Sequence, residues 1–210
     1  MPENVNVYVS GSYKNSPGGR DNHDGYAGIA VSCPVYPNMS CSQKLSELDH
    51  IRGFVVTPAR VKLGSVVKGM QVILARLKIE QNKDIKFTLV SDCRNTVKYI
   101  TKWGVHYVEK YGNKYSKWKN SKRKKVKDAK LLQTAMSLAN QINANVKKKN
   151  LGGFELVYQK RSGKAKGSMQ AWRAAQMSRK QEEQGAQRVE DEEFDTDDEY
   201  VKIDRKIDLS

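Results

Sequence analysis

The segment that most constrains the fold is the apolar run at residues 84–93, which ends in a carboxylate. Its Phe87, Leu89 and Val90 predict a strand that is buried on both faces, as in α/β sheets covered by helices. Asp92 would then lie at the carboxyl end of this strand, where open α/β sheets place their ligand-binding crevices. A simpler interpretation stays open, in which Asp92 caps the helix expected to start at Arg94.

Further strands are predicted on both sides of this segment. Apolar and alternating runs predict strands at residues 5–9 and 26–31, a third strand within 48–56 after a loop at 34–42, and another at 154–158. Short connections between the first three favour an antiparallel meander. Gly25 and Gly28 in the second strand suggest that another segment approaches it closely.

Helices are expected between and after the strands. Pro58 opens the clearest one, whose apolar residues recur at helical spacing. Others are expected at residues 94–104, 126–142 and 168–181. We therefore predict one domain over residues 1–181. Residues 182–210 are acidic with few apolar side chains, so we expect a disordered tail that aids solubility, competes for a basic surface or recruits a basic partner.

The overall charge favours a polyanionic partner. The 210 residues include 38 Lys and Arg against 23 Asp and Glu, a formal net charge of +15, and nucleic acid is the usual partner of such chains. The three cysteines and three histidines show no metal-ligand spacing, so no metal or other cofactor is predicted. Without an apolar run of bilayer length or a signal-peptide pattern, we expect an intracellular protein, nuclear or cytoplasmic, with no membrane partner.

Positive charge is densest at residues 110–130, where ten Lys or Arg residues are opposed only by Asp128. Aromatic residues are interleaved with them, which favours contact with nucleic acid, since ammonium groups neutralise phosphates and rings stack on sugars or bases. A solvated basic surface with a nuclear-import signal is the alternative. The candidate contacts are Trp103, Lys114, Tyr115, Lys117, Trp118, Lys119, Lys122, Arg123, Lys124 and Lys125.

Four short motifs follow the order of a known family. The first motif is Tyr-Val-Ser-Gly-Ser at residues 8–12, which is similar to a first-strand motif of an aromatic residue, any residue, Asp, Gly and Ser. The second is Thr-Pro-Ala-Arg-Val-Lys at residues 57–62, which is similar to Thr-Asn-x-Arg-Ala-Glu. Ser-Asp-Cys at 91–93 is similar to Thr-Asp-Ser. Residues 161–163 and 167–172 are similar to His-Ser-Gly and Gly-Asn-x-x-Ala-Asp. Over about residues 5–177 the chain resembles the ribonuclease H-like superfamily, which implies an α/β fold with a five-stranded mixed sheet flanked by helices and a basic protrusion at 110–130.

The departures from the family concern its catalytic site. Family members hold two Mg²⁺ ions with four carboxylates, and the resemblance aligns these with Ser10, Lys62, Asp92 and Trp172, of which only Asp92 is acidic. One carboxylate beside an ammonium cannot hold two hard dications, so the resemblance implies a catalytically inactive domain. Lys62 would instead neutralise Asp92, and Trp172 would fill core space. Substitute ligands from loops are a less favoured alternative: Asp21, Asp24, Glu47 and Asp49.

The resemblance also implies a function. The protrusion would grip one nucleic-acid backbone, and a second positive surface would contact the other: Arg60, Arg161, Lys164 and Lys166. We therefore expect an inactive ribonuclease H-like domain that binds RNA, RNA–DNA hybrid or another duplex through a Lys/Trp-rich protrusion. Two alternatives remain: a protein-interaction scaffold within a larger complex, and an active divalent-metal nuclease with substitute ligands.

Overall fold

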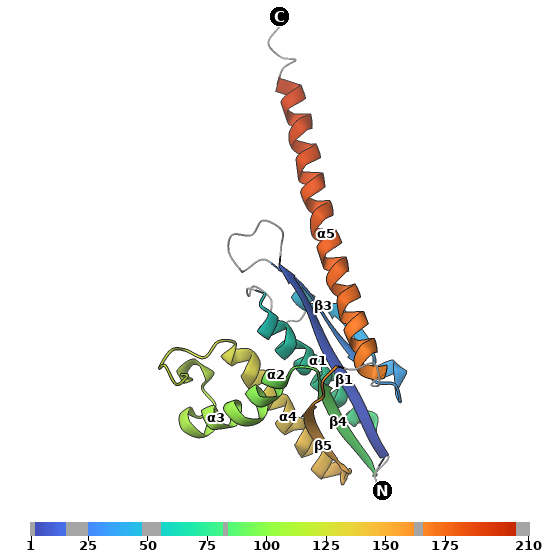
Figure 1. Ribbon diagram of the computed structural model, residues 1–210, viewed down its shortest axis with the longest axis vertical. Helices are drawn as coiled ribbons and strands as arrows, with labels where there is room; N and C mark the ends of the chain where they lie inside the picture. Colours follow the sequence, from blue (N-terminus) through green and yellow to red (C-terminus); the bar gives the residue numbers. More distant parts are fainter. Residues whose placement is uncertain (1–2, 16–24, 48–55, 82–83, 162–165, 205–210) are drawn as a thin grey trace, which may run out of the picture.

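The computed structural model describes residues 3–15, 25–47, 56–81, 84–161 and 166–204. In this part of the chain, five strands form one mixed sheet in the order β3-β2-β1-β4-β5 (Figure 1). The first three strands are antiparallel neighbours, and β4 and β5 are parallel to β1. The strands are β1 (Glu3–Asn15), β2 (Gly25–Ser32), β3 (Cys41–Lys44), β4 (Ile85–Ser91) and β5 (Gly153–Tyr158).

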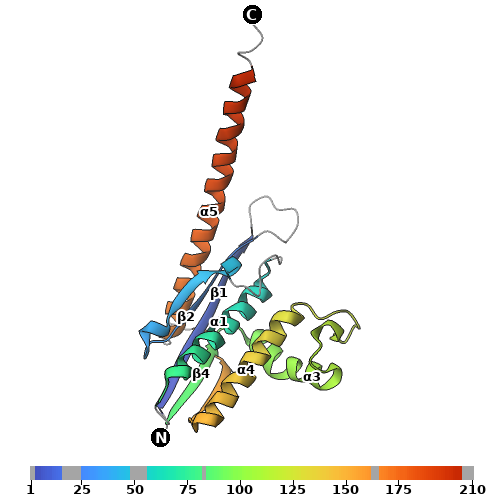
Figure 2. The same cartoon turned by 180° about the vertical axis from the view of Figure 1, so that it is seen from behind.

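Helices cover both faces of this sheet. Figure 2 shows α1 and α4 in front of the strands and α5 behind them, and α5 lies along β1 and β2. The helices are α1 (Pro58–Ile79), α2 (Arg94–Lys98), the π-helical η3 (Tyr99–Gly104), α3 (Val105–Tyr111), α4 (Ala129–Lys149) and α5 (Lys166–Asp204), with short 3₁₀ turns η1 (Pro37–Met39), η2 (Leu45–Glu47) and η4 (Tyr115–Lys117). None of the helices in the described residues is both long and apolar enough to span a bilayer.

The central strands are buried as their sequences predict. Val5, Val7 and Val9 of β1, and Phe87 and Leu89 of β4, are at most 2% exposed and belong to one hydrophobic core with the apolar stripe of α1. This arrangement brings the carboxyl ends of β4 and β5 and the first turn of α1 to one edge of the sheet. The predicted fold class and the antiparallel meander are confirmed.

Gly28 explains how α5 reaches the sheet. A Cβ atom built on Gly28 would lie 2.2 Å from the carbonyl oxygen of Ala175 and 2.5 Å from the nitrogen of Arg179, both on α5. A side chain there would collide with the helix backbone, so glycine is required for this packing. The predicted close approach is therefore confirmed for Gly28.

The third strand lies elsewhere than predicted. β3 occupies Cys41–Lys44, inside and just after the expected loop, where its backbone pairs with Gly28 to Val31 of β2. Residues 48–55 of the predicted strand lie outside the described part of the chain. The error has a physical reason: β3 is a short edge strand that is held by its backbone ladder, so it needs no alternating apolar pattern.

The helical segment after β4 also extends further than predicted. Instead of ending near Gly104, it continues through η3 and α3 to Tyr111, and Gly112, with a φ of 68°, ends it. Gly104 has a packing role, because a Cβ atom there would lie 2.5 Å from the sulfur of Met136. The glycine at this position serves the contact between η3 and α4 and does not end the helical segment.

Helix α5 extends into the acidic tail, whose expected disorder stays a prediction. Helix α5 continues as one helix through Asp204, and Figure 1 shows it running well past the sheet. The first part of this helix is held by packing against β1 and β2. Glu182 supplies one anchor by accepting a hydrogen bond from the backbone nitrogen of Ala27 at 2.6 Å.

Candidate functional site

Asp92 lies at the carboxyl end of β4, at the edge of the sheet where the sequence placed it. Its carboxylate accepts hydrogen bonds from Ser10 Oγ at 3.0 Å, from Lys62 Nζ at 3.0 and 3.3 Å, and from Arg161 Nε and Nη2 at 3.2 and 2.7 Å. The N-cap position of α2 is Cys93, so the interpretation of Asp92 as the helix cap is wrong. We call Ser10, Lys62, Asp92 and Arg161 the Asp92 cluster.

Three neighbouring elements bring the partners of Asp92 together. Ser10 follows Val9, which pairs with Ser91 in the parallel β1–β4 ladder. Lys62 lies in the first turns of α1, where the Thr57 side chain caps the helix by accepting a hydrogen bond from the Arg60 nitrogen. Arg161 follows β5, whose ladder to β4 is continued by the bond from the Gln159 nitrogen to the Ser91 oxygen. The predicted pairing of Lys62 with Asp92 is confirmed.

Arg161 was missed as a partner of Asp92, because the sequence assigned it to nucleic-acid contact. Its guanidinium lies over the Trp172 ring, 4.9 Å from the centroid, while bonding to Asp92 on one edge. Trp172 is therefore a platform for Arg161, half-buried on α5, and not simply filler for the core as predicted. The signal that could have revealed the pair is the position of Arg161 directly after a strand parallel to β4.

The charges around Asp92 keep it ionised. Burial is the largest influence on the pKa of Asp92 and raises it, but the charge of Lys62 and hydrogen bonds from Lys62, Arg161 and Ser10 together outweigh burial and lower the pKa below its ordinary value of 3.8. The side chain is 3% exposed. The negative charge of this buried carboxylate is thus compensated by two cationic partners.

This lowered pKa predicts a pH dependence of stability. The ionised form stabilises the fold above the unfolded-state pKa of about 3.9, and this contribution is lost as the pH falls through the lower folded-state pKa. We expect the difference in the free energy of unfolding between wild type and Asp92→Asn to be constant from about pH 5 to 7 and to shrink below about pH 4. Urea unfolding at each pH measures it, and a difference that persists unchanged in acid would contradict the assignment.

The cluster does not fit the metal pair that the resemblance implies. Mg²⁺ requires oxygen ligands, and the only carboxylate of the cluster already accepts hydrogen bonds from an ammonium and a guanidinium. Among the described residues, no group of three or more His, Cys, Asp or Glu side chains could hold a metal. Of the substitute ligands considered, Glu47 is exposed at the end of η2, and Asp21, Asp24 and Asp49 lie outside the described residues.

A groove of about 1000 Å³ begins beside this cluster at Lys62 and Cys93. The start of α1 forms one wall, and η3, α3 and the 120–128 loop form the other. Trp103, 49% exposed, and Tyr99 contact each other edge to face with centroids 5.6 Å apart and supply aromatic surface to the groove. The polar lining includes Asn95, Asn120 and Lys127. The groove thus joins the Asp92 cluster to the basic segment, residues 110–130.

Trp118 holds the basic segment from inside. It is fully buried, stacks on Tyr107 with centroids 5.6 Å apart and donates from Nε1 to the Gly112 oxygen at 2.9 Å. The prediction that Trp118 contacts nucleic acid is therefore wrong. A sequence of interleaved aromatic and basic residues is compatible with a surface that stacks on bases and with a loop that has its own small core. The burial of the Trp118 side chain distinguishes these two interpretations.

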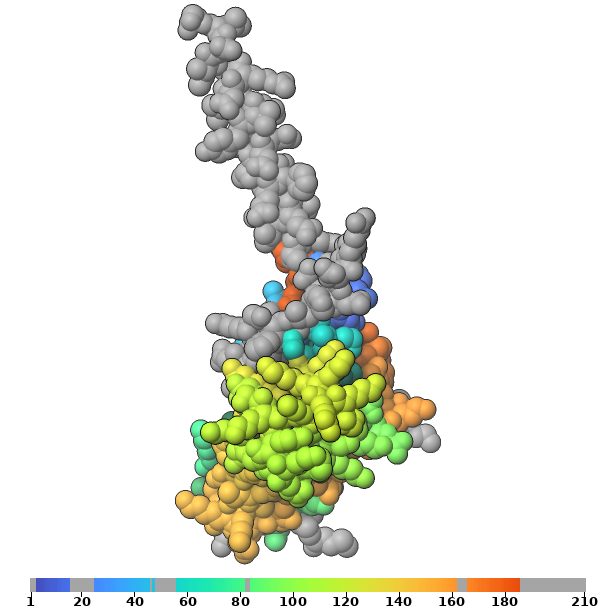
Figure 3. All heavy atoms as spheres, turned by 90° about the vertical axis from the view of Figure 1, so that its left-hand side faces the viewer, coloured from blue at the N-terminus to red at the C-terminus, as the bar shows by residue number. Residues whose placement is uncertain are grey.

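The lysines of this segment lie on the surface around that anchor. Figure 3 shows the residues from about 100 to 130, in green to yellow, covering one face of the molecule. Asn120 orders the tip, since its Oδ1 accepts from the nitrogens of Lys122 and Lys124 at 3.0 and 3.1 Å. We call the exposed cations of this loop the basic surface: Lys114, Lys117, Lys119, Lys122, Arg123, Lys124, Lys125 and Lys127. Tyr115 is also exposed beside them.

The second positive surface was predicted to comprise Arg60, Arg161, Lys164 and Lys166, and the described residues among these have different environments in the structure. Arg60 is mostly buried and its Nε donates to Asp128 at 2.7 Å, so it ties the loop to α1. It also lines the groove, and its contact with a ligand stays a prediction. Asp128 adopts a left-handed conformation with a φ of 57° and holds Arg60 instead of capping α4. Lys166 is exposed at the start of α5, and Lys164 lies outside the described residues.

Comparison with solved structures identifies the fold. A foamy viral protease-reverse transcriptase in complex with RNA/DNA hybrid matches with a TM-score of 0.58 and 14% identity over 83% of this chain and 20% of that one. The native prototype foamy virus protease-reverse transcriptase gives 0.54 and 14% over the same shares. The solution structure of the PFV RNase H domain gives 0.52 and 12% over 83% of this chain and 93% of that domain.

This chain thus spans about 20% of the two protease-reverse transcriptases. No protein-family model matches the sequence, and neither does any curated protein. The similarity is therefore one of fold. The chain has a ribonuclease H-like fold, as its four motifs predicted.

Proposed function

We propose that this chain, with its ribonuclease H-like fold, binds nucleic acid without cleaving it. The observation that carries the proposal is the basic surface, in which lysines surround a buried Trp118 on an ordered loop. Ammonium groups that neutralise phosphates release counterions, which gives binding that depends strongly on salt. A surface ordered before binding also loses less conformational entropy on association.

The groove supports a specific path for the bound strand. It runs from the basic surface at Lys127 past the exposed face of Trp103 to Lys62 at the Asp92 cluster. A nucleic-acid backbone along this path meets cations at both ends and an aromatic side chain between them, as single-strand and duplex grooves commonly provide. The foamy viral protease-reverse transcriptase that matches with a TM-score of 0.58 was solved with an RNA/DNA hybrid, so a hybrid is the first ligand to test.

The proposed absence of cleavage follows from the Asp92 cluster. Two-metal hydrolysis needs carboxylates that hold both ions, and here an ammonium and a guanidinium occupy the neighbourhood of Asp92. Labelled hybrid incubated with the protein and Mg²⁺ or Mn²⁺ should stay intact. Metal-dependent cleavage that Asp92→Asn abolishes would favour the active nuclease instead.

Binding is tested with matched charge variants. The test variant combines three substitutions: Lys119→Ala, Lys122→Ala and Lys124→Ala. We expect it to bind a labelled RNA–DNA hybrid in EDTA about 10- to 100-fold more weakly than wild type. The slope of log affinity against log salt should fall by about 2 to 3. The control is Lys78→Ala, Lys147→Ala, Lys148→Ala, which removes the same charge from exposed lysines at the far ends of α1 and α4. Double-stranded RNA, double-stranded DNA and single-stranded RNA of the same sequence identify the preferred ligand.

Equal weakening in both triple variants would mean that net charge, and not the basic surface, drives binding. A protein-interaction scaffold is the second candidate, because α5 extends far beyond the sheet that it covers. Two results would together favour that scaffold over the proposed function. Nucleic-acid binding would be weak in every variant, and the association of this chain with its protein complex would persist at high salt.

A further inference from the structure

The Asp92 cluster presents positive charge outward. Asp92 is 3% exposed, whereas the side chains of Lys62 and Arg161 are 23% and 35% exposed. Two cations and one carboxylate leave a formal charge of +1, and a ligand that approaches from solvent meets the cations first. An anion is therefore the ligand that this cluster suits, not the dications of the family.

Both cations have donors beyond those that Asp92 uses. An ammonium carries three N–H groups and a guanidinium five, and Asp92 accepts from Lys62 Nζ and from Nε and Nη2 of Arg161. Asp92 and the Trp172 ring fix the orientation of the guanidinium. A planar fork held in this way suits the paired oxygens of a phosphate, and little side-chain entropy remains to be lost on binding.

The position of Lys62 links this cluster to the rest of the surface. Lys62 lines the groove that also contains Lys127 and Trp103. A strand that follows the groove from the basic surface therefore reaches Lys62 at its end. On such a path, the group that Lys62 would meet is one phosphate of a longer backbone.

We propose that Lys62 and Arg161 form a metal-free clamp for a single backbone phosphodiester, with Asp92 as the positioning residue that orients both cations. This inference rests on the proposed function, since it names a contact within the same nucleic-acid interface. Ser10 supports the positioning by donating to Asp92 at 3.0 Å. No covalent step is involved, because the clamp holds the phosphate through charge and hydrogen bonds.

The test separates the ammonium of Lys62 from net charge. Lys62→Met with Asp92→Asn removes one cation and one anion, so the net charge of the protein and of the cluster is unchanged and no buried carboxylate is left without Lys62. We expect this double variant to bind the labelled RNA–DNA hybrid about 5- to 10-fold more weakly, with a salt slope lower by about 0.7 to 0.9, the value for one phosphate contact.

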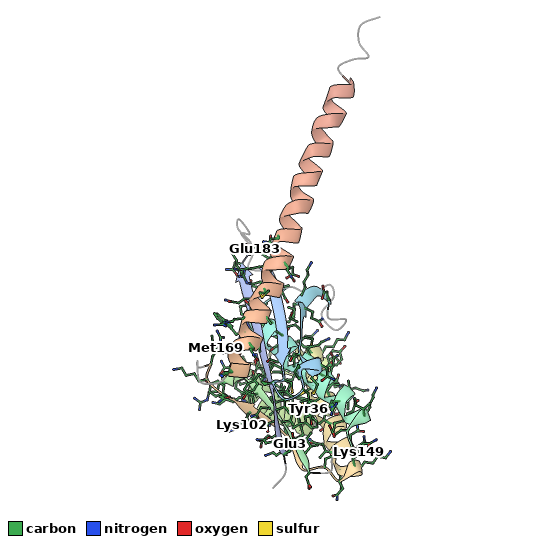
Figure 4. All side chains as sticks on the ribbon, turned by 90° about the vertical axis from the view of Figure 1, so that its right-hand side faces the viewer. Glu3, Tyr36, Lys102, Lys149, Met169 and Glu183 are labelled. Carbon is green, nitrogen blue, oxygen red and sulfur yellow. The ribbon has the colours of Figure 1, made fainter. Side chains whose placement is uncertain are left out.

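Lys148→Met is the matched control. Lys148 is an exposed lysine near the end of α4, about 30 Å along the helix from Ala129 beside the groove. The Lys148→Met substitution lowers the net charge of the protein by one, whereas the double variant leaves the net charge unchanged. We nevertheless expect Lys148→Met to bind the hybrid with the affinity and the salt slope of wild type. Figure 4 places the neighbouring Lys149 at the opposite end of the molecule's body from Glu183.

Arg161→Gln gives an independent readout. The amide can still donate to Asp92, and the side chain is partly exposed, so we expect a folded protein with binding weakened about fivefold or more and a salt slope lower by about 0.7 to 0.9. Circular dichroism and thermal unfolding verify the fold of each variant.

The outcomes distinguish the clamp from the proposed function. Wild-type affinity and slope in both cluster variants, together with weakened binding in the Lys119, Lys122 and Lys124 variant, would overturn the clamp and leave the proposed function standing. Wild-type binding in all of these variants would overturn both. Weakened binding in the cluster variants but not in Lys148→Met supports the clamp.

Discussion

Replacing Trp118 with alanine is expected to lower the free energy of unfolding by about 3–5 kcal/mol, the usual cost of deleting a buried Trp or Phe side chain. Trp118 is fully buried, stacks on Tyr107 and bonds to the Gly112 oxygen, so truncation removes packing and leaves a backbone acceptor without its donor. This cost is a large fraction of the stability of a typical domain. Urea unfolding followed by circular dichroism measures it.

The matched control for this variant is Trp118→Phe. Phenylalanine keeps most of the apolar contact with Tyr107 and loses the hydrogen bond, so we expect a smaller loss of about 1–2 kcal/mol, with hybrid binding close to that of wild type. If Trp118→Phe stays folded but loses binding as strongly as the triple lysine variant, then Trp118 contacts the nucleic acid directly and is more than an anchor of the loop. The comparison thus separates the anchoring of the loop from contact with a ligand.

Restoring carboxylates around Asp92 is expected to create a metal site. Ser10→Asp with Lys62→Glu would surround Asp92 with two further acidic side chains at positions whose present side chains bond to it at 3.0 Å. Like charges then destabilise the metal-free protein, and Mn²⁺ relieves their repulsion. At a concentration 100 times its dissociation constant, Mn²⁺ should add about 2.7 kcal/mol of stability to this variant and none to wild type.

The control is Ser10→Asn with Lys62→Gln, which has similar side-chain sizes without the charges. Thermal unfolding with and without Mn²⁺ reports the difference, and calorimetric titration measures the affinity. An identical, small response of both double variants would show that the side chains at positions 10 and 62 cannot share a cation with Asp92. The position-by-position correspondence with the family would then fail.

Parts of the site were also predicted before the structure. Local pattern placed Asp92 directly after a buried strand, and the resemblance to the ribonuclease H-like superfamily assigned Lys62 to the same site. Their ion pair follows from the need of a buried carboxylate for a cation. The edge strand β3 was placed wrongly, because its backbone ladder leaves no apolar period in the sequence.

By itself, the sequence determined the order of strands and helices, the burial of β1 and β4, the fold class and the density of positive charge, because hydrophobic periodicity and charge are properties of neighbouring residues. Beyond the pair of Lys62 and Asp92, only the tertiary structure decided which cations meet which carboxylates. Arg161 bonds to Asp92 across 69 positions, and Arg60 to Asp128 across 68. Contacts at such separations depend on how elements pack, so a surface role for Trp118 was compatible with the sequence until packing placed its side chain inside.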